Sequence, residues 1–284
     1  MRERIVVGGV LAAVLWPVPA ASAQQRTGEF GGGAVTTPPA PALGTGSMVI
    51  GLRSTDGTTV QITATIVGRC ASGTFTTTAP VAADGSFSVT GAVRQARTTT
   101  RYELRGVMSP TPSGTAAARF ERTTKARTQR CSAVDVVWEA RGPGGGFGDP
   151  AAVVPGALLL GMTAQRDGAG VPGAIALRTS PDGRFVSRAI YGVRMSCSGA
   201  GVSTTFDLPR HDLPIGPGGQ VGDVEAGTVE TDASILKYVE RFSATVGSAG
   251  ATGVFSVQLS VRRRATGKRV TLCRSGDVPW SASV

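Results

Sequence analysis

Apolar and polar residues alternate with a period of two along several short stretches of this chain. In residues 60–66, Val, Ile and Ala occupy every second position, and Gln and Thr lie between them. Residues 254–261 alternate in the same way, with Phe, Val and Leu on one side. Successive side chains of a strand point to opposite faces of a sheet, so this alternation predicts strands with one buried and one solvent-exposed face.

Glycine-containing turns separate these stretches. Asp-Gly pairs stand at 56–57, 84–85 and 182–183. Such pairs favour tight hairpin turns, because glycine adopts positive φ readily and aspartate tolerates it. Glycine contributes 40 of the 284 residues, aromatic residues only 5%, and no long stretch has the period of a helix. The pattern predicts an all-β fold of antiparallel, β-sandwich-like modules.

The first 23 residues predict a signal peptide. Arg2 and Arg4 precede an almost uninterrupted apolar run at 5–16, and the small residues at 21–23 fit a cleavage before Gln24. The apolar run is shorter than the roughly 20 residues that a membrane-spanning helix needs, and no second long apolar run follows it. We therefore expect a protein that is secreted or held in the cell envelope, with no transmembrane segment after cleavage.

Two later segments match each other in order and in spacing. A Leu-Arg-Ser or Leu-Arg-Thr triplet precedes an Asp-Gly pair in both segments, and a cysteine follows the aspartate 14 or 15 residues later. Each segment ends with a cysteine seven residues before a tryptophan, and Tyr102 and Tyr238 occupy matching places in between. These matches predict a duplicated module, with one copy at 47–141 and the other at 156–284.

The stretches outside the two modules are poor in core-forming side chains. Residues 24–46 are rich in Gly, Pro, Thr and Ala. This predicts a disordered leader, because such a segment buries too little apolar surface to offset its lost chain entropy. Residues 142–155 are rich in Gly and Pro and predict a flexible linker.

The four cysteines fall two to a module, at matching positions. Three pairings exist in principle. The repeat favours Cys70 with Cys131 and Cys197 with Cys273, because each module then folds with its own bridge. Export places them in an oxidising compartment, and each bridge should stabilise its module by roughly 4 kcal/mol. A zinc site or a reactive thiol is the alternative, but neither pair has C-x-x-C spacing and the chain has one histidine.

No set of residues specifies a reaction. His211, the single histidine, lies among prolines and charged residues that predict a surface loop, and no G-x-S-x-G elbow accompanies it. The chain has no calcium-loop motif and no phosphate loop that leads into a helix. We therefore expect no catalytic residue, no metal and no cofactor. Trp138 and Trp280 are expected in the cores of the modules near the bridges, with sugar stacking as the alternative.

Basic residues outnumber acidic ones and gather ahead of the second cysteine of each module. The formal net charge is +10, and it is +9 without the three charged residues of the signal peptide. The clusters are Arg119, Arg122, Lys125, Arg127 and Arg130 in the first module and Arg262, Arg263, Arg264, Lys268 and Arg269 in the second. They fit either charged edge strands that block aggregation or sites for an anionic polymer of the cell envelope. Nucleic acid is not an expected partner, because of the compartment and because no aromatic residues cluster for base stacking.

The second segment is similar to a broad class of secreted proteins of high-GC bacteria that are built from disulfide-containing, β-sandwich-like repeats. The likeness rests on residues 161–165, 172–178, 197–199, 251–253 and 273–276 and on Trp280. The first segment lacks the first of these stretches, and its Cys131-Ser-Ala133 departs from the Cys-x-Ser-Gly pattern of the second segment. The resemblance implies the fold and the export of the chain, and no activity.

Two kinds of function remain open. Duplication without a catalytic set favours a non-catalytic extracellular or envelope-associated protein with a binding or structural role. The alternative is a hydrolase that acts on a cell-surface polymer through carboxylates or His211, because a catalytic pair of carboxylates follows no spacing rule along a sequence.

Overall fold

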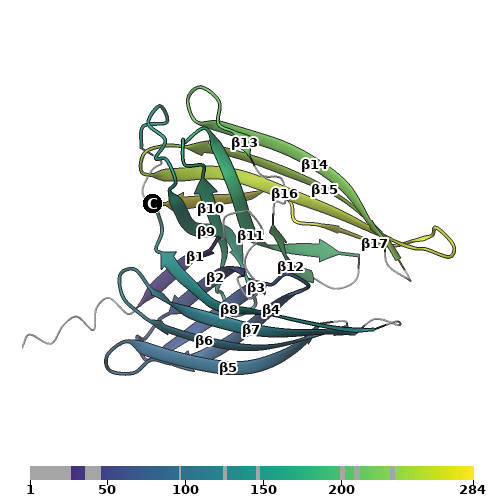
Figure 1. Cartoon of the computed structure of the whole chain (residues 1–284), viewed down its shortest axis with the longest axis horizontal. Coiled ribbons are helices and arrows are strands. Elements are labelled where there is room, and N and C mark those ends of the chain that lie inside the picture. Colours follow the sequence, from purple (N-terminus) through teal and green to yellow (C-terminus); the bar gives the residue numbers. More distant parts are fainter. Residues whose placement is uncertain are drawn as a thin grey trace, which may run out of the picture.

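The computed structural model describes residues 27–35, 46–95, 97–123, 127–144, 148–198, 202–207, 212–230 and 234–284. Every regular element in these ranges is a β-strand, and the strands form two antiparallel sheets (Figure 1). The predicted all-β class with two antiparallel modules is therefore confirmed. These ranges contain no helix that is long and apolar enough to cross a membrane. The predicted signal peptide, Lys125 and His211 lie outside the described residues.

Module one is a single eight-stranded sheet in the order β4-β3-β2-β1-β8-β7-β6-β5. Its strands are β1 (Gly28–Ala34), β2 (Ser47–Ser54), β3 (Thr59–Val67), β4 (Ser72–Pro80), β5 (Ser86–Gln95), β6 (Thr98–Val107), β7 (Ser113–Thr123) and β8 (Thr128–Arg141). The sheet is strongly curved, and its two halves enclose one core (Figure 1). Across that core, Phe75 of β4 stacks on Tyr102 of β6 with ring centroids 3.6 Å apart. The sandwich-like module is thus one sheet folded over on itself.

Module two is a ten-stranded sheet whose main path runs β12-β11-β10-β9-β18-β16-β15-β14. Its strands are β9 (Leu158–Arg166), β10 (Pro172–Thr179), β11 (Phe185–Cys197), β12 (Val202–Asp207), β13 (Leu213–Pro214), β14 (Gln220–Glu230), β15 (Ser234–Val246), β16 (Gly250–Arg263), β17 (Arg269–Arg274) and β18 (Val278–Ser283). β17 pairs with both β11 and β16. Strands β11, β10, β9, β18, β16 and β17 therefore close into a ring, and β15 and β14 extend from β16 beyond it.

The two sheets have the same strand order along their main paths. β9 to β12 take the places of β1 to β4, and β14 to β16 take the places of β5 to β7. The single long strand β8 corresponds to β17 and β18 together. In both sheets the closing tryptophan pairs with a glycine of the preceding long strand, Trp138 with Gly114 and Trp280 with Gly253.

The strand ladders correct one match that the sequence predicted. Tyr102 and Tyr238 do not occupy the same place in the two sheets. Counting along the ladders from the paired glycine and tryptophan of each module places Glu240, not Tyr238, at the position of Tyr102. The two tyrosines therefore lie two residues apart in this correspondence.

The prediction of a disordered leader at 24–46 is wrong for Gly28–Ala34, which form β1. This strand pairs with β2 along its whole length and with β8 at its end, so it sits in the middle of the sheet. The glycines that suggested disorder are needed here. A Cβ atom on Gly31 would collide with the carbonyl oxygen of Gly161 in module two, and one on Gly33 would collide with that of Met48. Only glycine permits so close an approach of the backbones.

The modules pack against each other through the outer faces of β1–β2 and β9–β10. A small apolar core fills this face, formed by Val35, Val49, Leu160, Ala174, Ala176 and Ile190. Glu29 of β1 lies between two arginines at its rim, 3.8 Å from Arg53 and 2.8 Å from Arg166 of module two. Arg53 also donates to the carbonyl oxygen of Ala169 at 2.8 Å. The modules therefore share a buried face.

The described part of the predicted linker is bonded to module two. The backbone N–H of Asp149 donates to the Ser248 hydroxyl at 3.0 Å, and the Ser248 N–H donates back to the carbonyl oxygen of Asp149 at 3.1 Å. The Thr179 hydroxyl donates to the carbonyl oxygen of Val154 at 2.7 Å. Residues 149 and 154 of the predicted linker are therefore anchored to module two by hydrogen bonds.

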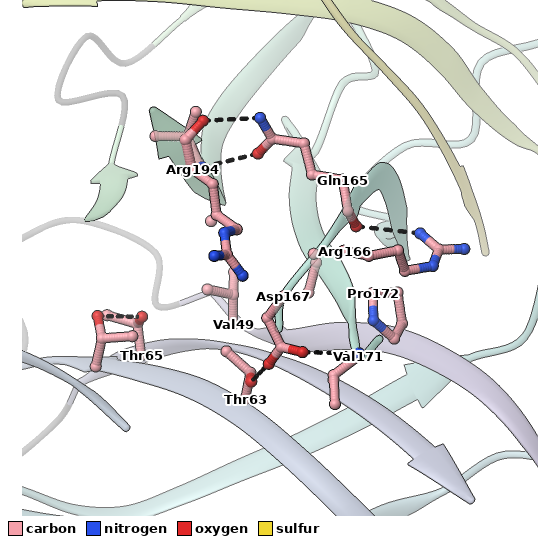
Figure 2. A pocket seen from close by; sticks show the side chains of 14 residues that line it. Val49, Thr63, Thr65, Gln165, Arg166, Asp167, Val171, Pro172 and Arg194 are labelled. Carbon is pink, nitrogen blue, oxygen red and sulfur yellow. Dashed lines mark hydrogen bonds between the residues drawn. The ribbon is translucent and has the colours of Figure 1, made fainter. Parts of the chain in front are cut away.

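A small cavity lies between the modules (Figure 2). Its volume is about 40 Å³, and residues of β3, β10 and β11 contribute to its lining. The Thr63 hydroxyl donates to the Asp167 carboxylate across the interface. The same carboxylate accepts the backbone N–H groups of Ala169 at 2.8 Å and Val171 at 2.9 Å. A space of this size holds about one water molecule, so we regard it as part of the contact between the modules and not as a ligand site.

Candidate functional site

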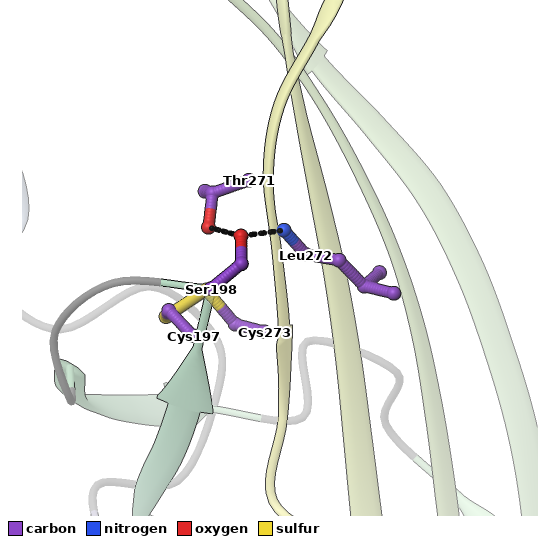
Figure 3. The surroundings of a disulfide bond; sticks show 5 residues. All are labelled: Cys197, Ser198, Thr271, Leu272 and Cys273. Carbon is purple, nitrogen blue, oxygen red and sulfur yellow. Dashed lines mark hydrogen bonds between the residues drawn. A yellow bond between two sulfur atoms is a disulfide. The ribbon is translucent and has the colours of Figure 1, made fainter.

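The predicted disulfides are confirmed, as Cys70–Cys131 and Cys197–Cys273, and no cysteine is free. The second bond joins residues that face each other in the ladder between β11 and β17, where the ring of module two closes. Beside it, the Ser198 and Thr271 hydroxyls lie 2.9 Å apart (Figure 3). The cysteines are therefore structural, and the two bridges are compatible with an extracytoplasmic location.

The closing tryptophans lie in the cores, as predicted. Trp138 is fully buried and Trp280 is 4% exposed. Trp280 stacks on Phe242 with ring centroids 5.5 Å apart. Neither ring presents a face on which a sugar could stack.

The basic cluster of module two lies on the hairpin between β16 and β17. Arg262 and Arg269 face each other in the ladder, and the N–H of Arg263 donates to the carbonyl oxygen of Lys268 at 2.9 Å. Arg264 forms an ion pair with Glu230 at 3.2 Å. All residues from 262 to 270 are exposed. The sequence-predicted residues thus come together on one exposed hairpin.

The basic cluster of module one lies on the corresponding hairpin between β7 and β8. Arg119, Arg122, Arg127 and Arg130 are all exposed. Arg130 forms an ion pair with Glu121 at 3.2 Å. This hairpin and that of module two project at the same end of the molecule (Figure 1). Two basic tips from separate modules therefore point in a common direction.

The interior of module two contains a polar cluster that the sequence analysis missed. The Tyr191 hydroxyl donates to the Glu240 carboxylate, and the Tyr238 hydroxyl donates to Glu225 at 2.9 Å. Glu225 and Glu240 face each other in the ladder between β14 and β15. Tyr191 is fully buried, Glu240 is 2% exposed and Glu225 is 8% exposed. Acidic side chains are almost never buried to this extent without a cationic partner.

Burial and like charge alter the titration of this cluster. Burial is the main cause that raises the pKa of Glu240 to about 7, and the nearby carboxylates of Glu225 and Asp223 add to the rise. The hydrogen bond from Tyr191 opposes it, because it stabilises the charged form. Burial, followed by the charge of Glu240, raises the pKa of Tyr191. Glu240 is therefore a buried carboxyl group that holds a proton near neutral pH.

Two carboxylate oxygens of this cluster, Oδ2 of Asp223 and Oε2 of Glu225, are buried without a hydrogen-bond partner among the described residues. In the same ranges, no three His, Cys, Asp or Glu side chains are arranged so that they could hold a metal ion. The alternation of Val221, Asp223 and Glu225 could have indicated this interior position, since all three point to the same face of β14. Acidic residues are, however, usually found on solvent-facing sides, which hides this signal.

Comparisons with known proteins give no family. No protein-family model and no curated protein matches the sequence. Among solved structures, kievitone hydratase from Nectria haematococca is similar with 8% identity and a TM-score of 0.22, covering 94% of each chain. A structure described as AttH from Nitrosomonas europaea is similar with 9% identity and a TM-score of 0.23, covering 96% of this chain and all of the other. Similarity at this level indicates nothing about the activity of this chain.

Proposed function

We propose that this protein is a non-catalytic, extracytoplasmic binding protein that holds an anionic polymer of the cell envelope. The observation that carries the proposal is the pair of exposed basic hairpins at one end of the molecule. The sequence has a net charge of +10, so the whole molecule attracts a polyanion, and the two tips concentrate that charge. The N-terminal signal pattern and the two disulfides support export.

The packing of the modules strengthens this proposal. A polymer bound by one tip meets the second tip at high effective concentration, because both belong to one molecule. The shared face between the modules fixes the separation of the tips, so less freedom is lost on binding than with an unattached linker. The common strand order supports an origin by duplication, which would have doubled the number of tips.

A hydrolase acting on the same polymer is the alternative. Glu225 and Glu240 face each other, and one of them titrates near neutral pH, as a general acid or base would. Both side chains, however, lie inside the sheet and are at least nine-tenths buried. A polymer on the surface would not reach them, so binding is the function that the geometry supports better.

Retention on purified cell envelopes tests the proposal. We expect retention of the mature protein to fall steeply as salt rises, because contacts between exposed charges are screened within about 8 Å at physiological ionic strength. Changing Arg262, Arg263 and Arg264 to Ser should weaken retention about tenfold at low salt, since each exposed contact contributes up to about 1 kcal/mol.

The matched control removes three arginines from elsewhere on module two. Arg184, Arg241 and Arg274 are exposed and lie away from the hairpin tip. Changing these three to Ser removes the same charge and should alter retention much less. If retention changed neither with salt nor with the tip substitutions, the proposal would be wrong. If both triple variants lost retention equally, the net charge and not the hairpin tip would be responsible.

A further inference from the structure

The outer face of module one carries arginines on four neighbouring strands. They are Arg94 on β5, Arg101 on β6, Arg119 on β7 and Arg130 on β8. All four are exposed. Adjacent strands lie about 4.8 Å apart. Arg101 and Arg119 are directly opposite, and Arg94 and Arg130 lie two residues off their neighbours on the same face, so the four side chains form a diagonal basic stripe across the sheet. The stripe leads to the basic hairpin tip of the same module.

Two of these arginines are direct neighbours in the sheet. Arg101 and Arg119 face each other in the ladder between β6 and β7. Like charges at directly opposite positions destabilise a sheet. The nearest carboxylates on this face are engaged elsewhere, because Glu103 pairs with Arg105 at 2.5 Å and Glu121 with Arg130. Neither Arg101 nor Arg119 forms an ion pair within the described ranges.

The fold itself does not require this pair. Counted along the ladders from the closing tryptophans, the positions of Arg101 and Arg119 are occupied in module two by Val239 and Gln258, which also face each other. The second module thus forms the same pair of strands with two uncharged residues. The arginines in module one add like-charge repulsion to the free protein, which a bound anion would relieve.

We infer that the outer face of β5–β8 binds the phosphate groups of a linear, phosphate-bearing polymer, with Arg101 and Arg119 sharing one phosphate. This inference rests on the proposed function and names the charged group that the polymer carries. A carboxylate has two oxygens and is satisfied by a single guanidinium fork. A phosphate within a chain has two charged non-bridging oxygens on a tetrahedral centre, so guanidinium groups from two neighbouring strands can each donate to one of them.

Binding to inorganic polyphosphate tests the inference. The mature protein should bind it, and changing Arg101 and Arg119 to Ser should weaken binding on the order of tenfold. The slope of log affinity against log salt should fall by about 1, because one phosphate contact is lost. The control variant, with Arg241 and Arg274 changed to Ser, loses the same charge from module two and should bind nearly as well as the unchanged protein.

Thermal unfolding separates a binding role from a structural one. Removal of the like-charged pair should leave the unfolding temperature unchanged or raise it at low salt. A fall in unfolding temperature that matches the loss of binding would overturn the inference. So would equally tight binding of polyglutamate of the same length, because the stripe would then recognise charge and not phosphate.

The outcomes also distinguish the inference from the proposed function. If substitution of Arg101 and Arg119 leaves binding to polyphosphate unchanged while the hairpin-tip substitutions weaken binding to envelopes, the proposed function stands and the inference is wrong. If the unchanged protein binds neither polyphosphate nor envelopes at low salt, both are wrong.

Discussion

The two modules carry different side chains at equivalent positions of their two sheets. In module one, Gly91 faces Tyr102 in the ladder between β5 and β6, and a Cβ atom on Gly91 would collide with the tyrosine hydroxyl. The glycine leaves room for the ring, which stacks on Phe75. In module two the corresponding ladder positions hold Glu225 and Glu240. An aromatic stack in one module thus corresponds to a pair of buried carboxyl groups in the other.

The residue that packs against this position also differs between the modules. Six residues before its first cysteine, module one has Ala64 and module two has Tyr191. Ala64 leaves space for aromatic packing, whereas Tyr191 supplies the hydroxyl that Glu240 accepts. The comparison teaches that strand order and disulfides define the module, while the interior is free to change. It also indicates that only module two should respond to pH near neutrality.

Removal of the disulfides should have the largest effect and should affect both modules alike. The bridges close loops of similar length, with sequence separations of 61 and 76 residues. Replacing either pair, Cys70 with Cys131 or Cys197 with Cys273, by Ser should lower the free energy of unfolding of its module by about 4 kcal/mol. Denaturant unfolding, followed by the fluorescence of the buried tryptophan of each module, measures this. If removal of one bridge lowered the free energy of unfolding of its module and removal of the other did not, the bridges would not be equivalent.

The stability of module two should depend on pH. Glu240 has a pKa of about 7 in the folded protein against 4.5 for an ordinary glutamate. The folded state therefore binds this proton more tightly, and its stabilising effect is complete below about pH 4.5 and is lost as the pH rises through 7. The loss should reach about 3 kcal/mol. Unfolding at pH 5 and pH 8 in a Trp138→Phe background, in which Trp280 reports module two, measures it.

The control for this experiment is Glu240→Gln, which cannot titrate and should flatten the dependence. Module one, followed through Trp138 in a Trp280→Phe background, should show little change over the same range. An unaltered pH profile in Glu240→Gln would show that another group is responsible.

Removal of a tyrosine hydroxyl should have the smallest effect on stability, and the effect should differ clearly between the two modules. Tyr191→Phe removes the donor to Glu240 and leaves a buried carboxylate oxygen unpaired, which should cost about 1–3 kcal/mol at pH 8. The pKa of Glu240 should rise further, because the lost hydrogen bond had stabilised its charged form. The pH transition measured by unfolding should therefore move upward. Tyr102→Phe, which keeps the stack on Phe75, should change stability by less than about 0.5 kcal/mol.

Much of the fold could be predicted from local pattern. The alternation at 60–66 and 254–261 matches strands β3 and β16. The glycines of the three Asp-Gly pairs, Gly57, Gly85 and Gly183, all adopt positive φ. The pairs at 56–57 and 182–183 join strands that pair as hairpins. The hairpin expected at 84–85 is wrong, because β4 and β5 are the two edges of their sheet and do not pair. Equal spacing of cysteine and tryptophan indicated both disulfides and both core tryptophans. These features depend on residues close in sequence or on comparison of the two segments, and both are visible in the chain itself.

The remaining features depend on contacts between distant residues. β1 was missed because glycine is ambiguous: it signals disorder unless another backbone lies against it, as Gly161 lies against Gly31. The interior cluster was missed because Glu225 and Glu240 become a pair only when β14 and β15 align. Arg101 and Arg119 likewise become neighbours only when β6 and β7 align.

The packed face between the modules also governs the order in which the chain can be completed. Module one is synthesised first, yet Val49 and Gly31 on its outer face are covered by Leu160 and Gly161 of module two. Until β9 and β10 arrive, this strip remains open to water and to neighbouring chains, which is the situation in which multidomain proteins misassemble. Module two therefore covers an apolar strip that module one alone would expose, and we expect a chain cut between the modules to aggregate more readily.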